Sequence, residues 1–495
     1  MKNMKFRNDR GSALLLTFFV GLVVSILAFV LYTLSMKEMA LAERQRKRVT
    51  ALHIAEAGIE RAIFDLRQDF ISSYSWTDGD INGQVFVLNN NFQVMPYADT
   101  TLNNGTYTVM LKNGDRPRDI WIKSSGVFES MTQTIQVYAS IQRYSIWDNA
   151  IFAGSGQNGG VIKGNVNVAG SVHVLGDALT STDFAIDLNG TATLAANNYS
   201  ALDTALRNRL PPLENIVFDG DNVETLRSHL RVKNGQVNLG GTGQIGETNV
   251  AGNAFKETAD AAFVEDGIVE TSGPTNVHVD RRGLYDLGNM FSFPLLGSDE
   301  DPDSYASFFK SQAYQVIDAA ELAQLAAITP ESVFAIGDEN GMIAMDGEGH
   351  LLVSGCLYIE GDLKLKTNPA GIKTITYQGT ASILAEDGIV INSGLVTPDT
   401  TDSFPTSNIL GFMTPQKIVL GEKAQKDVMG LFYAEDDIKV SKQTNIIGTL
   451  VSNYFDLSQQ VPSVFQVPAT VDHLPPHMIG SDPFYLFRIV SWQRI

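Results

Sequence analysis

The N-terminal part of the chain, up to Phe70, carries the clearest pattern of hydrophobic and polar positions. The run from Ala13 to Ser35 contains no Asp, Glu, Lys, Arg or His. At about 1.5 Å rise per residue, a helix of this length crosses a hydrocarbon core of roughly 30 Å. A secretory signal peptide has a shorter apolar run, about 7–15 residues, followed by a small-residue cleavage site. The pattern therefore predicts a membrane span over residues 13–35.

The helix is expected to continue well beyond the span. Strong helix formers follow it, and no proline occurs before Pro96. Apolar residues recur there at three- and four-residue steps, at Leu52, Ala55, Ile59, Ala62, Ile63, Leu66 and Phe70. This spacing is typical of a helix that buries one face. We therefore predict one long helix over residues 12–70.

Period-two alternation replaces the helical spacing further along the chain. Three runs rich in β-branched and aromatic residues, "GTYTVML", "DIWIKSSGVF" and "TQTIQVYASIQRY", are separated by turn residues. Such runs are typical of half-buried strands. They predict an antiparallel sheet in a head over residues 71–148, with one face packed on the helix.

After Asp148 the pattern changes to regularly spaced glycines. Glycine falls at every sixth position in two separate stretches, at 164, 170 and 176 and again at 349, 355 and 361. A longer repeat also occurs, because "GCLYIEGDLKL" (355–365) aligns with "GLFYAEDDIKV" (430–440). Short strands with turn glycines at such periods bury a core only by stacking on one another.

We therefore predict a β-solenoid, or β-helix, of right or left hand over residues 149–470. The alternative is a sandwich of short strands. Helical spacing near 200–215 and 301–333 predicts helices inserted between the coils. The aromatic segment 471–495 is expected to close the solenoid or to return to the head.

The N-terminal segment resembles a known family. Arg10-Gly11-Ser12 before the apolar run and "HIAEAGIERAI" (53–63) after it are similar to PilX-type minor pilins of the type IV pilin and pseudopilin superfamily. The resemblance covers residues 7–67. It implies an α+β N-terminal pilin-like module, made of a long helix and an antiparallel sheet, and says nothing by itself about the mainly β solenoid predicted after it. It also implies that residues 1–11 are a cytoplasmic leader, that a prepilin peptidase cuts after Gly11 and that Ser12 becomes the methylated N-terminus.

One position departs from the pattern of that superfamily. Major pilins carry a Glu at the fifth mature position, which neutralises the N-terminus of a neighbouring subunit, whereas this chain has Leu16. A subunit without the carboxylate avoids the cost of burying it but cannot make that pairing. Leu16 in the helix bundle therefore has two explanations. Either the subunit lies at the fibre tip, where no subunit above it needs the pairing, or this subfamily simply tolerates Leu at the position.

Charge bears on orientation and on partners. Basic residues precede the span, and "RQRKR" (44–48) follows it at a distance, so we expect a cytoplasmic N-terminus and a single pass through a bacterial inner membrane. Residues 68–495 carry 25 Lys+Arg against 49 Asp+Glu. A surface this acidic argues against nucleic acid as a partner. Cys356 is the only cysteine, which excludes an intramolecular disulfide.

The search for catalytic chemistry finds little. The seven histidines have no metal-ligand spacing, and nucleophile-elbow and phosphate-loop motifs are absent. Adjacent carboxylates, Asp436 and Asp437, would point to alternate faces of a strand. We expect no enzymatic activity.

"DGDING" (78–83) begins like a calcium loop, with Asp78, Asp80 and Asn82 as oxygen ligands, but Asn89 takes the place of its final Glu. Calcium is therefore a weak candidate, and no other cofactor is expected.

The sequence as a whole predicts a pilin-like structural subunit, a minor or tip pilin of a type IV pilus or a related secretion pseudopilus. Its expected partners are other minor and major pilins, the prepilin peptidase and the inner membrane. The bulk is expected in the periplasm, and at the pilus tip or cell surface after assembly. There the acidic solenoid would serve assembly initiation or adhesion to a host or matrix glycan or protein. The alternative is a membrane-tethered carbohydrate-binding or carbohydrate-active β-helix protein, and a third reading is a scaffold that never enters a fibre.

Overall fold

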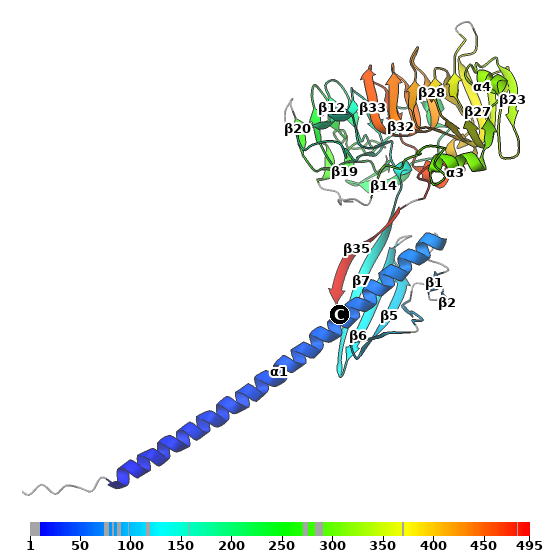
Figure 1. The fold of residues 1–495 in the computed structure, drawn as a ribbon. Helices are drawn as coiled ribbons and strands as arrows, with labels where there is room; N and C mark the ends of the chain where they lie inside the picture. Colours follow the sequence, from blue (N-terminus) through cyan, green and yellow to red (C-terminus); the bar gives the residue numbers. More distant parts are fainter. Residues whose placement is uncertain are drawn as a thin grey trace, which may run out of the picture. The chain divides into compact units, whose positions relative to one another are not determined.

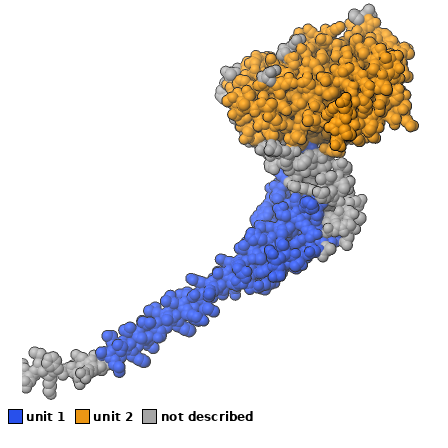
Figure 2. Space-filling model, viewed as in Figure 1, with its two compact units in different colours: residues 1–144, 484–495 blue, residues 145–483 orange. Residues whose placement is uncertain are grey.

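The structure is a computed structural model of the chain. It describes residues 10–73, 79–81, 84–86, 91–97, 99–114, 119–157, 159–270, 276–282, 291–368, 371–482 and 484–495. The chain divides into two compact units (Figure 2), of which unit 1 holds residues 1–144 and 484–495 and unit 2 holds residues 145–483. A long N-terminal helix is followed by a mostly β body (Figure 1), which confirms the coarse architecture expected from the sequence.

Unit 1 begins with a single helix, α1 (Arg10–Ser73), which extends beyond both ends of the range 12–70. It contains no proline to break it and runs unbroken through Gly21. Its second half buries most of the expected stripe, with Ala55, Ala62 and Leu66 fully inaccessible to solvent and Leu52 half-buried, while the side chain of Phe70 lies outside the described residues. Its first half buries none of its apolar residues against the described part of the chain. The helix therefore packs on the sheet along only part of its length.

The sheet of unit 1 is antiparallel and has the strand order β3-β5-β6-β7-β35. Its strands are β3 (Gln93–Val94), β5 (Gly105–Asn113), β6 (Asp119–Phe128), β7 (Met131–Tyr144) and β35 (Phe484–Arg494), and β4 (Thr101–Leu102) pairs with β5. Three of them, β5, β6 and β7, coincide with the three alternating runs of the sequence. The last strand of the chain, β35, lies beside β7, so the end of the aromatic C-terminal segment, residues 484–495, returns to unit 1, while the part up to 483 belongs to unit 2. A small separate hairpin pairs β1 (Gly79–Ile81) with β2 (Gln84–Phe86).

Two glycines let α1 approach this sheet closely. A Cβ at Gly126 in β6 would lie 2.2 Å from the carbonyl oxygen of Ala51, and a Cβ at Gly58 would lie 2.3 Å from the Ser124 hydroxyl. Larger residues at either place would push the helix and the sheet apart.

Unit 2 consists mainly of short parallel strands stacked in two ladders. The first ladder pairs, from one strand to the next, β22 (Tyr314–Val316), β25 (His350–Ile359), β27 (Thr374–Ala385), β30 (Ile409–Thr414), β32 (Asp427–Ser441), β33 (Asn445–Gln459), β8 (Ile151–Ala153), β11 (Val172–Val174), β16 (His229–Val232), β19 (Ala259–Val264) and β21 (Val279–Arg282). The second ladder contains β26 (Asp362–Leu365), β28 (Gly388–Ile391), β31 (Lys417–Leu420), the ends of β32 and β33, β9 (Gly160–Lys163), β12 (Phe184–Leu188), β17 (Gln236–Leu239) and β20 (Ile268–Glu270). Shorter pairs are formed by β10 (Asn167–Ala169) with β34 (Ser463–Phe465), β13 (Thr193–Leu194) with β18 (Gln244–Ile245), and β29 (Gly394–Val396) with β27.

The two halves of unit 2 meet in the middle of the stack. The first strand of the unit, β8, pairs in parallel with β33, a strand from its C-terminal half, with Leu450 opposite Ile151. The indole of Trp147 also donates a hydrogen bond to the carbonyl oxygen of Ile479 at 2.9 Å. The two ends of unit 2 therefore lie close together within that unit.

Identical positions of successive strands bury the core. One row runs in register through Ile383, Phe412, Phe432, Leu450, Ile151, Val172 and Leu230, all at most 1% exposed. Within this row the rings of Phe412 and Phe432 stack with centroids 5.4 Å apart and nearly parallel planes. Stacking of like side chains in this way buries apolar area continuously along the ladder.

The inserted helices are shorter than the sequence suggested. Near 200–215 only α2 (Thr204–Arg207) forms, because Pro211 and Pro212 follow closely and the next residues pair as the hairpin of β14 (Glu214–Phe218) and β15 (Asp221–Thr225).

Near 301–333 the chain forms two helices, α3 (Tyr305–Gln312) and α4 (Ala319–Leu325). Each begins at a capping side chain, Ser304 and Asp318 respectively. The antiparallel strands β23 (Val333–Gly337) and β24 (Gly341–Asp346) follow them and pair onto β25.

Candidate functional site

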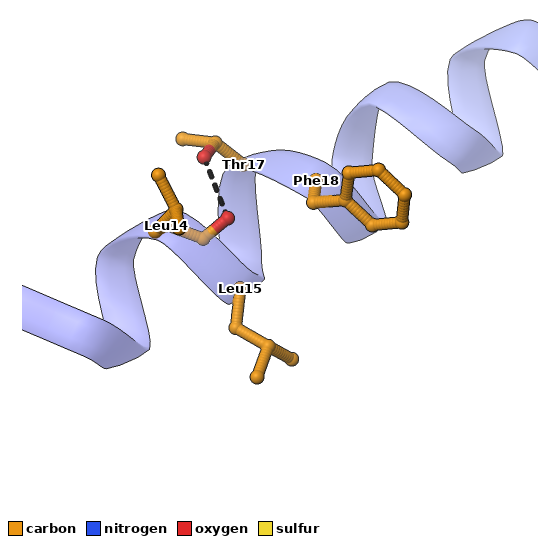
Figure 3. Close-up of a pocket in the computed structure, with 4 residues that line it drawn as sticks. All are labelled: Leu14, Leu15, Thr17 and Phe18. Atoms are coloured by element: carbon orange, nitrogen blue, oxygen red, sulfur yellow. Dashed lines mark hydrogen bonds between the residues drawn. The ribbon is translucent and has the colours of Figure 1, made fainter.

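The apolar half of α1 is the candidate assembly segment. Its large apolar side chains from Leu14 to Leu34 are between 39% and 76% exposed. Figure 3 shows Leu14 and Leu15 projecting from different sides of the helix, and Phe18 follows about one turn after Leu14. A helix that is apolar all round requires lipid or protein around it.

Three hydroxyl groups in this segment donate hydrogen bonds to carbonyl oxygens of the helix itself. The Thr17 hydroxyl donates to the carbonyl oxygen of Leu14 at 2.9 Å (Figure 3). Ser25 donates to Gly21 at 2.8 Å, and Thr33 donates to Val30 at 2.8 Å. Because these hydroxyls need no outside partner, the segment suits a medium without water.

The processing residues expected from the sequence lie at the start of this helix. The backbone of Gly11 and Ser12 is helical, within the first turn of α1. Leu16 is 65% exposed and belongs to the apolar surface of the segment. Its side chain adds no charge to that surface.

Beyond the apolar segment, charged side chains fix the helix to the head. Lys47 on α1 forms an ion pair with Glu129, in the turn between β6 and β7, at 2.5 Å. Arg46 pairs with Glu43 on α1 at 2.8 Å, and its hydrogen bond holds the pKa of the Glu43 carboxyl down to about 2. The basic run 44–48 is therefore partly neutralised by acidic neighbours of the same unit.

Arg61 makes the main polar contact between α1 and the sheet. Its guanidinium donates to the Tyr107 hydroxyl at 2.9 Å and to the carbonyl oxygen of Asp99 at 2.6 Å, and it lies 4.5 Å from the centre of the Tyr97 ring. Burial raises the pKa of the Tyr97 hydroxyl, which therefore stays protonated at physiological pH. These contacts hold α1 in place on the head while its apolar half remains exposed.

The carboxylates considered for catalysis are used in structural contacts. Asp436 accepts a hydrogen bond from Gln157 at 2.8 Å, and Asp437 pairs with Lys417 at 2.6 Å. Glu435 accepts from the backbone N–H of Leu296 at 2.8 Å. The three adjacent acids thus hold different segments of unit 2 and do not converge on a common point.

Cys356 is buried in β25, and burial raises the pKa of its thiol to about 11. At neutral pH the thiol is therefore protonated and a poor nucleophile.

The calcium candidate falls largely outside the described residues. Asp78 and Asn82 lie outside them, and of Asp80 only the backbone, in β1, is described.

Another cluster was not anticipated, at the turn between β24 and β25. Asp346, Glu348 and His350 bring their ligand atoms within 4.8 Å of one another, and all three are exposed. Asp346 accepts hydrogen bonds from the backbone N–H of Glu348 at 2.7 Å and from the His350 ring at 2.7 Å. These bonds lower the pKa of Asp346 and account for the conformation of the turn. The only sequence pattern that could have indicated this cluster is "DGEGH" (346–350), in which charged residues alternate with glycine.

Comparison with known proteins agrees with this geometry. No family model matches the chain, and no curated protein matches it significantly. Among solved structures, the chain is similar to the crystal structure of the competence-associated pilin ComZ from Thermus thermophilus, with a TM-score of 0.55 and 20% sequence identity. The match covers 91% of this chain and 97% of that one. The chain therefore has a pilin-like fold with a long N-terminal apolar helix.

Proposed function

We propose that the protein is a minor, tip-type pilin subunit of a type IV pilus or a related secretion pseudopilus. The observation that carries this proposal is the apolar half of α1, whose side chains stay exposed while the other half of the helix is bound to the head. Such a segment is stable in a bilayer before assembly and in a bundle of like helices afterwards. The likeness in fold to a competence-associated pilin supports the same role.

The N-terminal residues complete the proposal. We assign Gly11 and Ser12 as the prepilin peptidase cleavage site, with methylation of Ser12, on their resemblance to the PilX-type segment. Leu16 in place of a carboxylate favours a position at the tip of the fibre, where there is no further subunit whose charged N-terminus needs to be neutralised. The N-terminus would lie in the cytoplasm, the apolar half of α1 in the inner membrane, and the head and unit 2 beyond it.

Unit 2 is proposed to be a β-solenoid that displays a contact surface. The parallel pairing of successive strands supports it, since Gly430 in β32 pairs with Gly448 in β33. The period varies along the stack, because the step from His350 to its partner Thr376 is longer than the step from Gly430 to Gly448. We propose a structural, non-enzymatic role in assembly initiation or adhesion, and the structural contacts of Asp436 and Asp437 give no support to a glycan-cleaving site.

The first experiment is the intact mass of the N-terminal peptide from native cells with and without the prepilin peptidase. We expect a mature protein that begins at methylated Ser12 only where the peptidase is present. A chain that still begins at Met1 in both strains would overturn the proposal.

A second experiment tests the tip assignment by counting copies of the protein per fibre. We expect a few copies in the wild type and more along the shaft for Leu16→Glu. Leu15→Glu is the matched control, because it adds the same charge one position away and should not raise incorporation. Wild-type protein present along the whole shaft would contradict a tip role.

A further inference from the structure

The C-terminal strand β35 carries an exposed apolar strip. Ile489, Val490, Trp492 and Ile495 are between 45% and 60% exposed. The strand lies at the edge of the sheet of unit 1, and β7 is its sole pairing partner among the described residues. An apolar strip on an edge strand is a marker of protein association.

The register of β35 shows which face of the sheet carries the strip. Trp492 lies opposite Val137, and Ile489 lies opposite Ala139. Val137 and Ala139 are fully buried in the core formed with α1. Directly paired residues of antiparallel strands share a face. Ile489 and Trp492 therefore continue the surface on which α1 packs, beyond the cover that α1 provides. Arg494 shares their face, because it lies opposite the buried Ile135, whereas Ile495 donates its N–H to Thr134 and follows the other face.

Lipid does not reach this surface when α1 spans a membrane over 13–35. Three contacts place the C-terminal end of β35 along α1. Arg494 in β35 pairs with Ile135 in β7, and Ile135 pairs with Ser124 in β6. Ser124 in turn lies against Gly58 of α1. At about 1.5 Å rise per residue, Gly58 lies roughly 35 Å along the helix from Ser35, the end of the span. The strip is therefore exposed to water until protein covers it.

We infer that the apolar pair Ile489 and Trp492, on this face of β35, is the docking surface for the apolar N-terminal helix of a neighbouring pilin-like subunit. This inference rests on the proposed function. The side chains of Ile489 and Trp492 lie on the face of the sheet, so they suit a helix laid across that face, as α1 itself is laid. The uncharged segment from Ala13 to Ser35 shows the chemistry of such a helix and needs cover once it leaves the membrane. Trp492 would be the central anchor, since buried tryptophans dominate binding energy at interfaces.

The direct test is photo-crosslinking in native cells, with a photoreactive amino acid replacing Trp492 in the full-length chain. We expect a crosslink, identified by mass spectrometry, to a peptide from the apolar N-terminal helix of a pilin-like subunit. Ser491 is the matched control, because it lies opposite Tyr138 and points to the other face of the sheet. A crosslink from position 492 to lipid or to a non-helical peptide, no crosslink, or equal crosslinking from both positions would overturn the inference.

A second measurement separates this inference from the proposed function. Trp492→Ala should lower the number of copies recovered in purified fibres by about tenfold, whereas Ser491→Ala should leave it unchanged. Wild-type protein absent from fibres would refute the proposed function itself. Wild-type protein present in fibres, with Trp492→Ala recovered equally well, would refute the docking surface alone.

Discussion

The two units differ in how they cover apolar side chains. In unit 2 the row through Phe412, Phe432 and Leu450 is closed by the next strand of the ladder, and these residues are fully buried. In unit 1 one helix covers one face of a five-strand path, while half of that helix and the strip on β35 stay exposed. Unit 2 therefore builds a closed core from its own strands, whereas unit 1 is completed only by lipid or by other subunits. This difference supports the proposal that unit 1 serves assembly and unit 2 displays a contact surface.

The largest expected effect is on the ladder of unit 2. Gly448 has φ +138°, and a Cβ there would lie 1.9 Å from the carbonyl oxygen of Gly430 in the next strand. Gly448→Ala should lower the free energy of unfolding of unit 2 by about 4 kcal/mol, through backbone strain and the broken ladder. Hydrogen exchange resolved by peptide measures this in detergent-solubilised full-length protein.

Gly361→Ala serves as the control for that substitution. Its Cβ would meet only the end of the Leu322 side chain at 3.3 Å, which can move. Equal exchange in the two variants would show that the ladder is looser than its register implies.

The next effect should be confined to unit 1. Gly126→Ala would place a Cβ 2.2 Å from the carbonyl oxygen of Ala51, so α1 must move away from the sheet. We expect a loss of about 3 kcal/mol, seen as faster exchange in β5, β6 and residues 51–66 with unit 2 unchanged. Gly21→Ala, where a Cβ meets nothing within 4 Å, is the control in the same helix. Faster exchange in both units would show that the core of unit 2 is not stable independently of the core of unit 1.

Local patterns predicted unit 1 well. The three alternating runs correspond to β5, β6 and β7, because a sheet with one face on a helix needs that alternation. The stripe from Ala51 to Leu66 likewise marks the buried face of α1. The exposed strip on β35 could not be assigned to a face from sequence, since its face depends on pairing with β7, which lies on the far side of unit 2 in the sequence.

Unit 2 was predictable only in part. Glycine spacing indicated short stacked strands, but several strands have only three or four residues and are largely buried on both sides, so they show no alternation. The pairing of β8 with β33 joins opposite ends of the unit's sequence, for which no local signal exists. The cleavage at Gly11, the tip role of Leu16 and the absence of enzymatic activity stay predictions.

The smallest expected effect is a pH dependence confined to unit 2. His173 in β11 is 4% exposed and lies against the rings of Phe152 and Phe291, with centroids 5.1 and 5.6 Å away. Burial, together with the nearby Arg231, lowers the pKa of His173 well below 6.5, and burial lowers the pKa of His229 to about 4. The unfolded chain therefore takes up protons below pH 6.5 that the folded unit does not. Stability should be constant above that pH and fall by about 1 kcal/mol at one pH unit below it for His173 alone.

The measurement is the denaturation midpoint of unit 2 at pH 7.5 and at pH 5.5, with hydrogen exchange resolved by peptide as the readout for each unit. His173→Leu should reduce the loss of stability on acidification, because the apolar side chain binds no proton in either state. His350→Leu, at an exposed turn of the same unit, should leave the loss unchanged. If unit 1 lost as much stability as unit 2 over this pH range, the acid sensitivity would not arise from the closed core around His173. The pH dependence of stability would then not distinguish the closed core of unit 2 from unit 1.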